Sequence, residues 1–365
     1  RQGKMLYEYC KYLPDVIRLY SQALRCGTRH AALAVSRMLT MWLDFANLQC
    51  QAYGGGGEAG PAQKLHQLAA REELSHAQME KDWQQIPDFQ WLPEVALLVS
   101  RTTVANTKAR QVVHQLLATL LAKYPEQLSW SIVPAALSIN AERKRHGESI
   151  VARARHKLMG QQGQQPGEQV HHDIVNQARR LVEQLKRVCK DESMGKREVS
   201  VRMSARWSTL FRMTGLPLVI PTHANMTAAP PEDGGAMRDY EPFSESSVLI
   251  DGWLDEVTVM SSLQRPKKVT LLGSDGYYYP FLCKPKDDLR KDLRMMELMT
   301  AGNRMLHKST NCRRRKLAAR CYAVVPLDNE CGLIEWVPNM QQARAIIKEY
   351  WVAYGHTLDT NDIKG

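Results

Sequence analysis

The sequence lacks the features that mark secreted, disulfide-built or membrane-spanning proteins. None of its eight cysteines forms a C-x-x-C pair, the spacing typical of zinc knuckles and redox motifs. No apolar run approaches the roughly 18 residues needed to span a bilayer, and the N-terminus has no signal-peptide core. Scattered cysteines in a long chain are typical of reduced intracellular proteins. We therefore expect neither a disulfide framework nor a membrane contact.

The two ends of the chain also lack the marks of a complete protein. The chain begins with Arg1 rather than methionine, and its last stretch, AYGHTLDTNDIKG, carries no terminating element. We therefore expect a fragment of a longer protein.

The composition is that of an ordinary globular protein with a basic balance. The chain has 365 residues, of which 44% are apolar and 24% charged, and a formal net charge of +11. This length suffices for two or three domains. The charge favours anionic partners such as nucleotide phosphates, nucleic acid or acidic proteins, without choosing among them.

Residues 1 to about 215 are predicted to form helix after helix, without strand-like alternation. Apolar residues recur at helical spacing in three stripes: Val35, Met38, Leu39, Trp42 and Phe45; Val104, Val112, Val113, Leu116, Leu117, Leu120 and Leu121; and Ile174, Leu181, Val182, Leu185 and Val188. Loops are expected at 53–60 and 160–169. Helical hairpins joined by short loops predict an α-solenoid over residues 1–160, followed by a linker and helices over 161–215.

The character of the sequence changes near Gly215. GLPLVIPT suits a strand, and KKVTLLGSDGYYYPFLCK is typical of a hairpin with strands at 269–272 and 277–284. Further strands are expected in RCYAVVPLD and GLIEWVP, with helices over 289–306 and in MQQARAIIKEYW. Residues 216–365 are thus predicted to form a small α+β part.

Lys284 ends the second strand of that hairpin, and three acids follow within eight positions. A lysine at a strand end can hold phosphate oxygens as a point charge, and an acid at the following helix can orient it. Asp287, Asp288 and Asp292 are the candidates. The alternative is a solvated charge cluster that caps a helix N-terminus, and this stretch alone favours that alternative.

Other stretches carry weaker signals. SSLQRPKK lies where a phosphate-covering loop belongs, yet it lacks G-x-G-x-x-G. GLIEWVPN ends in Trp336, whose ring can stack on a base, although a core position is the commoner case. CRRRK (312–316) is expected to be a solvated loop rather than a nucleic-acid contact. The adjacent histidines of VHHD (170–173) do not share a helix face, so no metal site is predicted.

Taken together, residues from about 257 to 349 closely resemble the kinase N-lobe of the phosphatidylinositol-3-kinase-related protein kinases. The resemblance lies in SLQRPKK, GSDG, CKPKDDLRKD, YAVVPL and ECGLIEWV, and it is strongest with the checkpoint-kinase branch. RMLTMWLDFA and KYPEQLSW resemble the helical FAT region of the same kinases. The implied fold is mainly α: a helical-hairpin FAT solenoid, then an α+β kinase N-lobe with a twisted antiparallel sheet and a helix. The kinase C-lobe is expected to be missing.

The resemblance also implies a nucleotide site. Lys284 would contact the ATP phosphates, Asp287 would orient it, and Asp292 would line the pocket. The loop that covers the phosphates would contain Ser261, Gln264, Arg265 and Pro266. Leu282 and Tyr322 would line the adenine pocket. Glu335, Trp336 and Val337 would form the hinge, with Trp336 stacking on adenine and the backbone of Val337 bonding its edge.

Two departures from the family pattern qualify these expectations. Pro280 interrupts the strand that leads to Lys284, so its nitrogen must face away from a ladder partner. No histidine–aspartate catalytic loop with a downstream asparagine and no Asp-Phe-Gly-type metal motif occurs in the chain. These motifs supply the base and the magnesium ligands. We therefore expect no catalytic or metal-binding residue in this fragment, and no activity from it alone.

For the full-length parent, the resemblance implies a serine/threonine protein kinase of DNA-damage and replication-stress checkpoint signalling in the nucleus. Its cofactors would be ATP and Mg²⁺, and its substrates proteins with Ser/Thr-Gln sites. A coiled-coil regulatory subunit, docking outside this fragment, would bring it to coated single-stranded DNA, an indirect partner. One alternative is a phosphoinositide (lipid) kinase, since the related family shares the pattern Lys-x-x-x-Asp-Leu-Arg-x-Asp. The other alternative is a non-catalytic α-solenoid scaffold.

Overall fold

The computed structural model describes residues 11–354 apart from 29, 55–61, 161–170, 196–197, 230, 232–239 and 245. Most of the loops predicted at 53–60 and 160–169, and Val170 of the VHHD stretch, lie outside the described residues. Backbone contacts divide the chain into two units, residues 1–335 and 336–365. The first unit contains the solenoid helices and all the strands.

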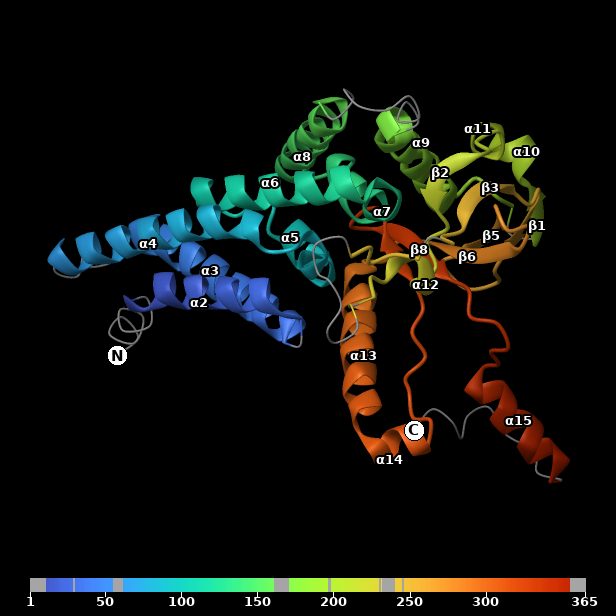
Figure 1. Cartoon of the computed structure of the whole chain (residues 1–365). Helices are drawn as coiled ribbons and strands as arrows, with labels where there is room; N and C mark the ends of the chain where they lie inside the picture. Colours follow the sequence, from blue (N-terminus) through green and yellow to red (C-terminus); the bar gives the residue numbers. More distant parts are fainter. Residues whose placement is uncertain are drawn as a thin grey trace. The chain divides into compact units, whose positions relative to one another are not determined.

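The first unit begins with a succession of helices that pack against one another (Figure 1). They are α2 (Leu13–Cys26), α3 (Ala31–Gly54), α4 (Ala62–Asp82), η1 (Trp83–Gln85), η2 (Asp88–Glu94), α5 (Val95–Ser100), α6 (Thr107–Lys123), α7 (Pro125–Ala136), α8 (Ala141–Gly160) and α9 (His171–Lys190). The sequence sets their ends: Asn106 caps α6 by accepting the Ala109 N–H at 3.0 Å, and Pro125 opens α7. The predicted α-solenoid is confirmed.

An antiparallel sheet follows, in the strand order β1-β4-β5-β6-β8-β7; β3 also pairs with β5, and β2 pairs with β3. The strands are β1 (Ser200–Arg202), β2 (Leu216–Val219), β3 (Leu249–Trp253), β4 (Glu256–Val259), β5 (Lys267–Gly273), β6 (Tyr278–Pro285), β7 (Val324–Pro326) and β8 (Cys331–Glu335). Short helices α10 (Met203–Arg206), α11 (Ser208–Phe211) and α12 (His223–Met226) lie in its connections. The predicted hairpin is β5 and β6.

Two expectations about this part of the chain are wrong, and two strands were missed. The helical part does not run unbroken to about 215, because β1 forms at Ser200–Arg202 and pairs with β4. The alternation in LIDGW and EVTV, which makes β3 and β4, was not foreseen. The strand expected in GLIEWVP ends at Glu335.

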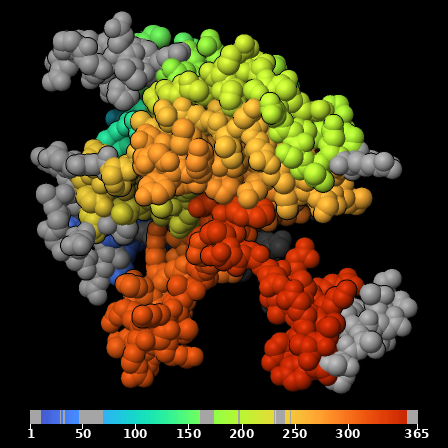
Figure 2. Space-filling model, turned by 90° about the vertical axis from the view of Figure 1, so that its right-hand side faces the viewer, coloured from blue at the N-terminus to red at the C-terminus, as the bar shows by residue number. Residues whose placement is uncertain are grey.

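Helix α13 (Arg290–Lys308) follows β6 and continues into the short α14 (Thr310–Arg314). No residue of either helix is buried, and Figure 2 shows this pair of helices, in orange, projecting away from the sheet, although α13 contacts β7. The solvated loop expected at 312–316 is therefore partly helical, although its arginines are exposed as expected. The second unit contains α15 (Ala343–Ala353).

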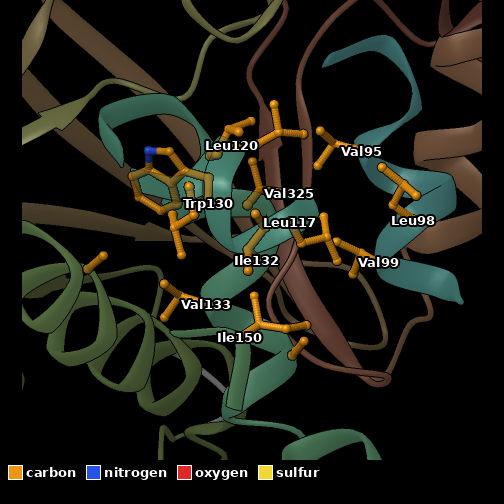
Figure 3. Packing of buried hydrophobic residues seen from close by; sticks show 14 of the residues in the cluster. Val95, Leu98, Val99, Leu117, Leu120, Trp130, Ile132, Val133, Ile150 and Val325 are labelled. Carbon is orange, nitrogen blue, oxygen red and sulfur yellow. The ribbon is translucent and has the colours of Figure 1, made fainter. Parts of the chain in front are cut away.

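The core of the solenoid continues into the sheet without a break. Helix α7 packs against β2 and β7, and Trp130, Ile132 and Val133 of α7 meet Val325 of β7 in one apolar cluster (Figure 3). The Trp130 indole donates to the Val219 carbonyl at 2.9 Å. Helix α9 packs against β2, β6 and β8. The strand that carries Lys284 is therefore backed by the last solenoid helix.

Candidate functional site

Strand β6 presents Lys284 on its half-exposed face. The strand alternates: Phe281 and Cys283 are fully buried, whereas Leu282 and Lys284 are partly exposed, as the two-residue period of a strand requires. Leu282 lies opposite Lys268 of β5 and Ile334 of β8, and paired residues share a face. One face of the sheet thus packs on α9, and the other offers Lys284 beside apolar side chains.

The Lys284 ammonium forms an ion pair with the carboxylate of Asp287. A left-handed backbone at Lys286, with φ of 53°, turns the chain back after β6. The Asp287 N–H then donates to the Glu330 carbonyl at 3.0 Å. The expected partner of Lys284 is therefore beside it, and both ends of Asp287 are held.

The other two acids near Lys284 do not pair with it. Asp288 accepts two hydrogen bonds of 2.7 Å from the Arg290 guanidinium, which hold the pKa of its carboxyl below the usual range. Asp292 lies half-exposed in the first turn of α13, where the helix dipole favours an acid. The Arg290 ion pair therefore explains Asp288 and the helix dipole explains Asp292, while Asp287 orients the lysine.

The loop between β4 and β5 lies beside the Lys284 end of β6. Lys267 pairs with Cys283, so Pro266, one residue earlier, lies level with Lys284. The Met260 N–H donates to the Pro266 carbonyl at 2.9 Å and closes the loop. Ser261 and Gln264 are exposed at its tip. Pro266 is buried, and the contact of these three loop residues with the ATP phosphates stays a prediction.

Arg265 of the same loop points elsewhere. Its guanidinium donates to the carbonyls of Met194 at 3.3 Å, Gly195 at 2.7 Å and Glu198 at 2.6 Å. A guanidinium with its donors used in this way ties the loop to the segment after α9. The predicted contact of Arg265 with ATP thus remains a prediction, and the structure gives its side chain an anchoring role.

Pro280 fits the strand as expected. It lies opposite Thr270 of β5, whereas the pairing of β6 with β8 begins only at Phe281. The missing N–H therefore falls beyond the β8 ladder and removes none of its bonds.

The other predicted pocket residues lie on β6, just before β7 and at the end of β8. Tyr322 and Leu282 are half-buried. The Glu335 carboxylate accepts the N–H of Ala323 at 2.7 Å and of His223 at 2.8 Å, so it holds α12 and the start of β7 to the end of β8. Trp336 and Val337 follow as the first residues of the second unit, and their role at a nucleotide base stays a prediction.

Two buried charges near the site were missed by sequence reasoning. Lys267 is 3% exposed and donates to the carbonyls of Cys189 at 3.1 Å and Asp191 at 2.7 Å; burial lowers its pKa. The alternation of β5, which buries Lys267, Val269 and Leu271, could have signalled it. Asp328, in the turn between β7 and β8, is buried against α9, and no local pattern marks it.

The described residues fit phosphate better than metal. One ammonium, oriented by a carboxylate on a half-exposed face, can hold phosphate oxygens. Within the described ranges, no group of three or more His, Cys, Asp or Glu side chains is arranged to hold a metal ion, so we assign no magnesium ligand there. None of the described helices combines the length and the apolar content needed to cross a membrane.

Two family descriptions match parts of the chain. Residues 278–362 match "Phosphatidylinositol 3- and 4-kinase", a range that begins with β6 and includes Lys284 and Asp287. Residues 75–182 match "Serine/threonine-protein kinase ATR-like, HEAT repeats", a range that runs from α4 to α9. The two matches fall on the sheet part and on the solenoid, in the expected order.

Curated relatives extend over nearly the whole chain. "Serine/threonine-protein kinase ATR" of Oryza sativa subsp. indica is 33% identical over 94% of this chain and 12% of the relative. The ATR kinase of Arabidopsis thaliana is also 33% identical over the same shares. "Protein kinase rad3" of Schizosaccharomyces pombe is 30% identical over 96% of this chain and 14% of its own length. The chain therefore spans about an eighth of these relatives.

Solved structures support the fold. The open conformation of CtTel1 matches 98% of this chain and 14% of its own, with a TM-score of 0.62 and 18% identity. "FAT and kinase domain of CtTel1" matches 99% of this chain and 27% of its own, with a TM-score of 0.58 and 19% identity. A helical solenoid followed by a kinase N-lobe is thus the fold of the chain.

Proposed function

We propose that this chain belongs to the ATR-like protein kinases, as a segment of a longer protein. We further propose that its sheet forms the phosphate-holding part of an ATP site. The observation that carries the proposal is the Lys284–Asp287 ion pair at the end of β6. The pair lies inside the range that matches the kinase family. The full-length protein would be a serine/threonine protein kinase.

The chemistry of the pair supports this role. A lysine ammonium is a compact charge with three donors, suited to phosphate oxygens. Lys284 is 29% exposed, so its ammonium is accessible, while Asp287 restricts where it points. Phosphoryl transfer depends on positioning and electrostatic stabilisation, and Lys284 would provide both for the phosphates.

The remaining predicted residues would complete the site around ATP. Ser261, Gln264 and Pro266 would cover the phosphates, while Leu282, Tyr322, Trp336 and the Val337 backbone would hold adenine. Asp292 would line the pocket beyond Asp287. ATP would bind with Mg²⁺, whose ligands we place outside this chain.

The wider setting follows from the relatives. Three of them are named as ATR or rad3 kinases, and we infer checkpoint signalling after DNA damage, in the nucleus, with protein substrates at Ser/Thr-Gln sites. A coiled-coil subunit, docking outside this chain, would link the kinase to DNA. The match to phosphatidylinositol kinases makes lipid phosphorylation the second candidate.

The decisive experiment replaces Lys284 in the full-length protein. Lys284→Ala should lower kcat/KM for phosphorylation of a Ser-Gln peptide by roughly 100-fold or more, because a preorganised charge at the phosphates is lost. Lys291→Ala is the matched control, since Lys291 is an exposed lysine in the first turn of α13. It should leave the rate unchanged.

The same assay separates the alternatives. Both variants should keep the unfolding temperature of the parent, which excludes misfolding as the cause. Phosphate transfer to phosphatidylinositol vesicles rather than to peptide would favour the lipid kinase. Equal rates for Lys284→Ala and the parent would contradict the phosphate role and leave the non-catalytic scaffold.

A further inference from the structure

The buried carboxylate of Asp328 links the solenoid to the nucleotide site. Asp328 lies in the turn between β7 and β8, and its side chain is fully buried. One oxygen accepts the Lys186 ammonium at 2.8 Å and lies 3.5 Å from that of Lys190. Both lysines belong to α9, the last solenoid helix. A buried carboxylate with two cationic partners is fixed in place, because loss of a partner leaves an uncompensated charge.

Lys186 extends the link into a second solenoid helix. Its ammonium also donates to the Leu137 carbonyl at 2.7 Å, at the end of α7. Burial alone would raise the pKa of Asp328, but the hydrogen bond from Lys186 and the charges of both lysines outweigh burial. The pKa of the carboxyl is therefore below its usual value. The carboxylate is therefore ionised, and α7, α9 and the turn meet at one charge.

The turn that contains Asp328 also binds Asp287, the ion-pair partner of Lys284. The other carboxylate oxygen accepts the Asn329 N–H at 2.8 Å, and the N–H of Asp328 donates to the Cys331 carbonyl at 3.0 Å. Within this closed turn, the Glu330 carbonyl accepts the N–H of Asp287 at 3.0 Å. Each step from α9 to the Asp287 carboxylate is thus a direct contact.

We propose that Asp328 is a positioning residue for the nucleotide site, through which α9 of the solenoid sets the Asp287 carboxylate against the Lys284 ammonium. This inference rests on the proposed function of Lys284. It adds a residue that touches neither ATP nor substrate, and it makes the solenoid part of the geometry that holds ATP. A shift of α9 would change the position of the Lys284 ammonium through this turn.

Three further residues join the end of α9 and the segment after it to the same end of β5 and β6. Lys267 donates to the carbonyls of Cys189 and Asp191, and Lys286 pairs with Glu192 at 2.7 Å. Arg265 donates to the carbonyls of Met194, Gly195 and Glu198. Lys286 and Arg265 flank the Lys284 end of β6. The segment that follows α9 therefore contacts the Lys284 end of β5 and β6 through several side chains, as a positioning element requires.

The test uses Asp328→Asn in the full-length kinase, with steady-state kinetics against ATP and against a Ser-Gln peptide. Asparagine keeps the side-chain oxygen that accepts the Asn329 N–H and removes the charge that the lysines hold. KM for ATP should rise about tenfold, the size of one weakened hydrogen bond. KM for the peptide should stay unchanged, because the turn does not bear on the protein substrate.

Glu183→Gln is the matched control, because Glu183 also lies on α9, but its side chain is 44% exposed and pairs with Arg179 at 3.6 Å. This variant should keep the parent KM for ATP. Lys186→Met should repeat the effect of Asp328→Asn, and Lys186→Arg, which restores a cation, should recover most of it. If Asp328→Asn fails to fold, Lys186→Met supplies the same measurement.

The outcomes separate this inference from the function on which it rests. A lower unfolding temperature for Asp328→Asn with an unchanged KM for ATP would reduce Asp328 to a structural role and overturn the inference. The proposed function would survive that result if Lys284→Ala still abolished activity. A phosphorylation rate of Lys284→Ala equal to that of the parent would instead overturn the proposed function, whatever the result for Asp328→Asn.

Discussion

The buried histidine of helix α6 predicts how the stability of the solenoid depends on pH. His114 is 5% exposed, and Nε2 lies 2.9 Å from the Thr102 carbonyl. Burial lowers the pKa of His114 from 6.5 to about 4, while the Thr102 bond opposes this shift and the charges of His146, Arg153 and Arg110 add to it. The side chain is therefore neutral in the folded protein at pH 7.

The direction in which the free energy of unfolding changes with pH follows from proton binding. Between pH 6.5 and about pH 4 the unfolded chain binds a proton at His114 and the folded chain does not, so the free energy of unfolding falls as the pH falls. The loss from this side chain is about 2 kcal/mol at pH 5 and approaches about 3 kcal/mol below pH 4. Above pH 6.5 it contributes no pH dependence.

Urea unfolding at pH 7 and pH 5 measures this loss, with His114→Gln as the comparison. Glutamine keeps a donor for the Thr102 carbonyl but does not titrate. The parent should lose about 2 kcal/mol more than the variant between the two pH values. An equal loss in both proteins would show that His114 takes up its proton without unfolding, and the reasoning would be wrong.

Two further predictions concern packing and capping. Gly332→Ala should lower the unfolding temperature and weaken ATP binding, because the new Cβ would collide with the Val325 carbonyl oxygen at the position that pairs with Lys284. Thermal unfolding and nucleotide titration measure the two effects. An unchanged unfolding temperature and ATP affinity would refute the close approach. Asn106→Ala should cost about 1 kcal/mol of stability through the lost cap of α6. Urea unfolding measures it, and an unchanged free energy of unfolding would contradict the role of the cap.

Periodicity and turn chemistry predicted much of the fold. The stripes of α3, α6 and α9 are buried as expected, because an amphipathic helix must cover its apolar face. The hairpin of β5 and β6 followed from its turn and alternation. β1 could not be recognised, because three residues are too short for a period and their pairing with β4 is set by the tertiary fold.

The candidate site was predictable only where its contacts are local in the sequence. Lys284 and Asp287 are three residues apart, so their pairing was readable from CKPKDD. The partners of Asp328 lie on α9, far along the chain, and those of Arg265 follow the same helix. Such contacts depend on the packing of the sheet on α9, which no local pattern encodes. Arg265 was accordingly expected at ATP, whereas its donors are used by backbone carbonyls.

The central claim, that Lys284 holds the phosphates of ATP, is tested most directly by a reactive acyl-phosphate analogue of ATP that transfers its acyl group to a nearby lysine. The full-length protein would be labelled with and without excess ATP, and the modified lysine identified by mass spectrometry. We predict modification of Lys284, suppressed by ATP, with Lys291 unmodified. Modification elsewhere, or labelling of Lys284 that ATP does not suppress, would contradict the claim.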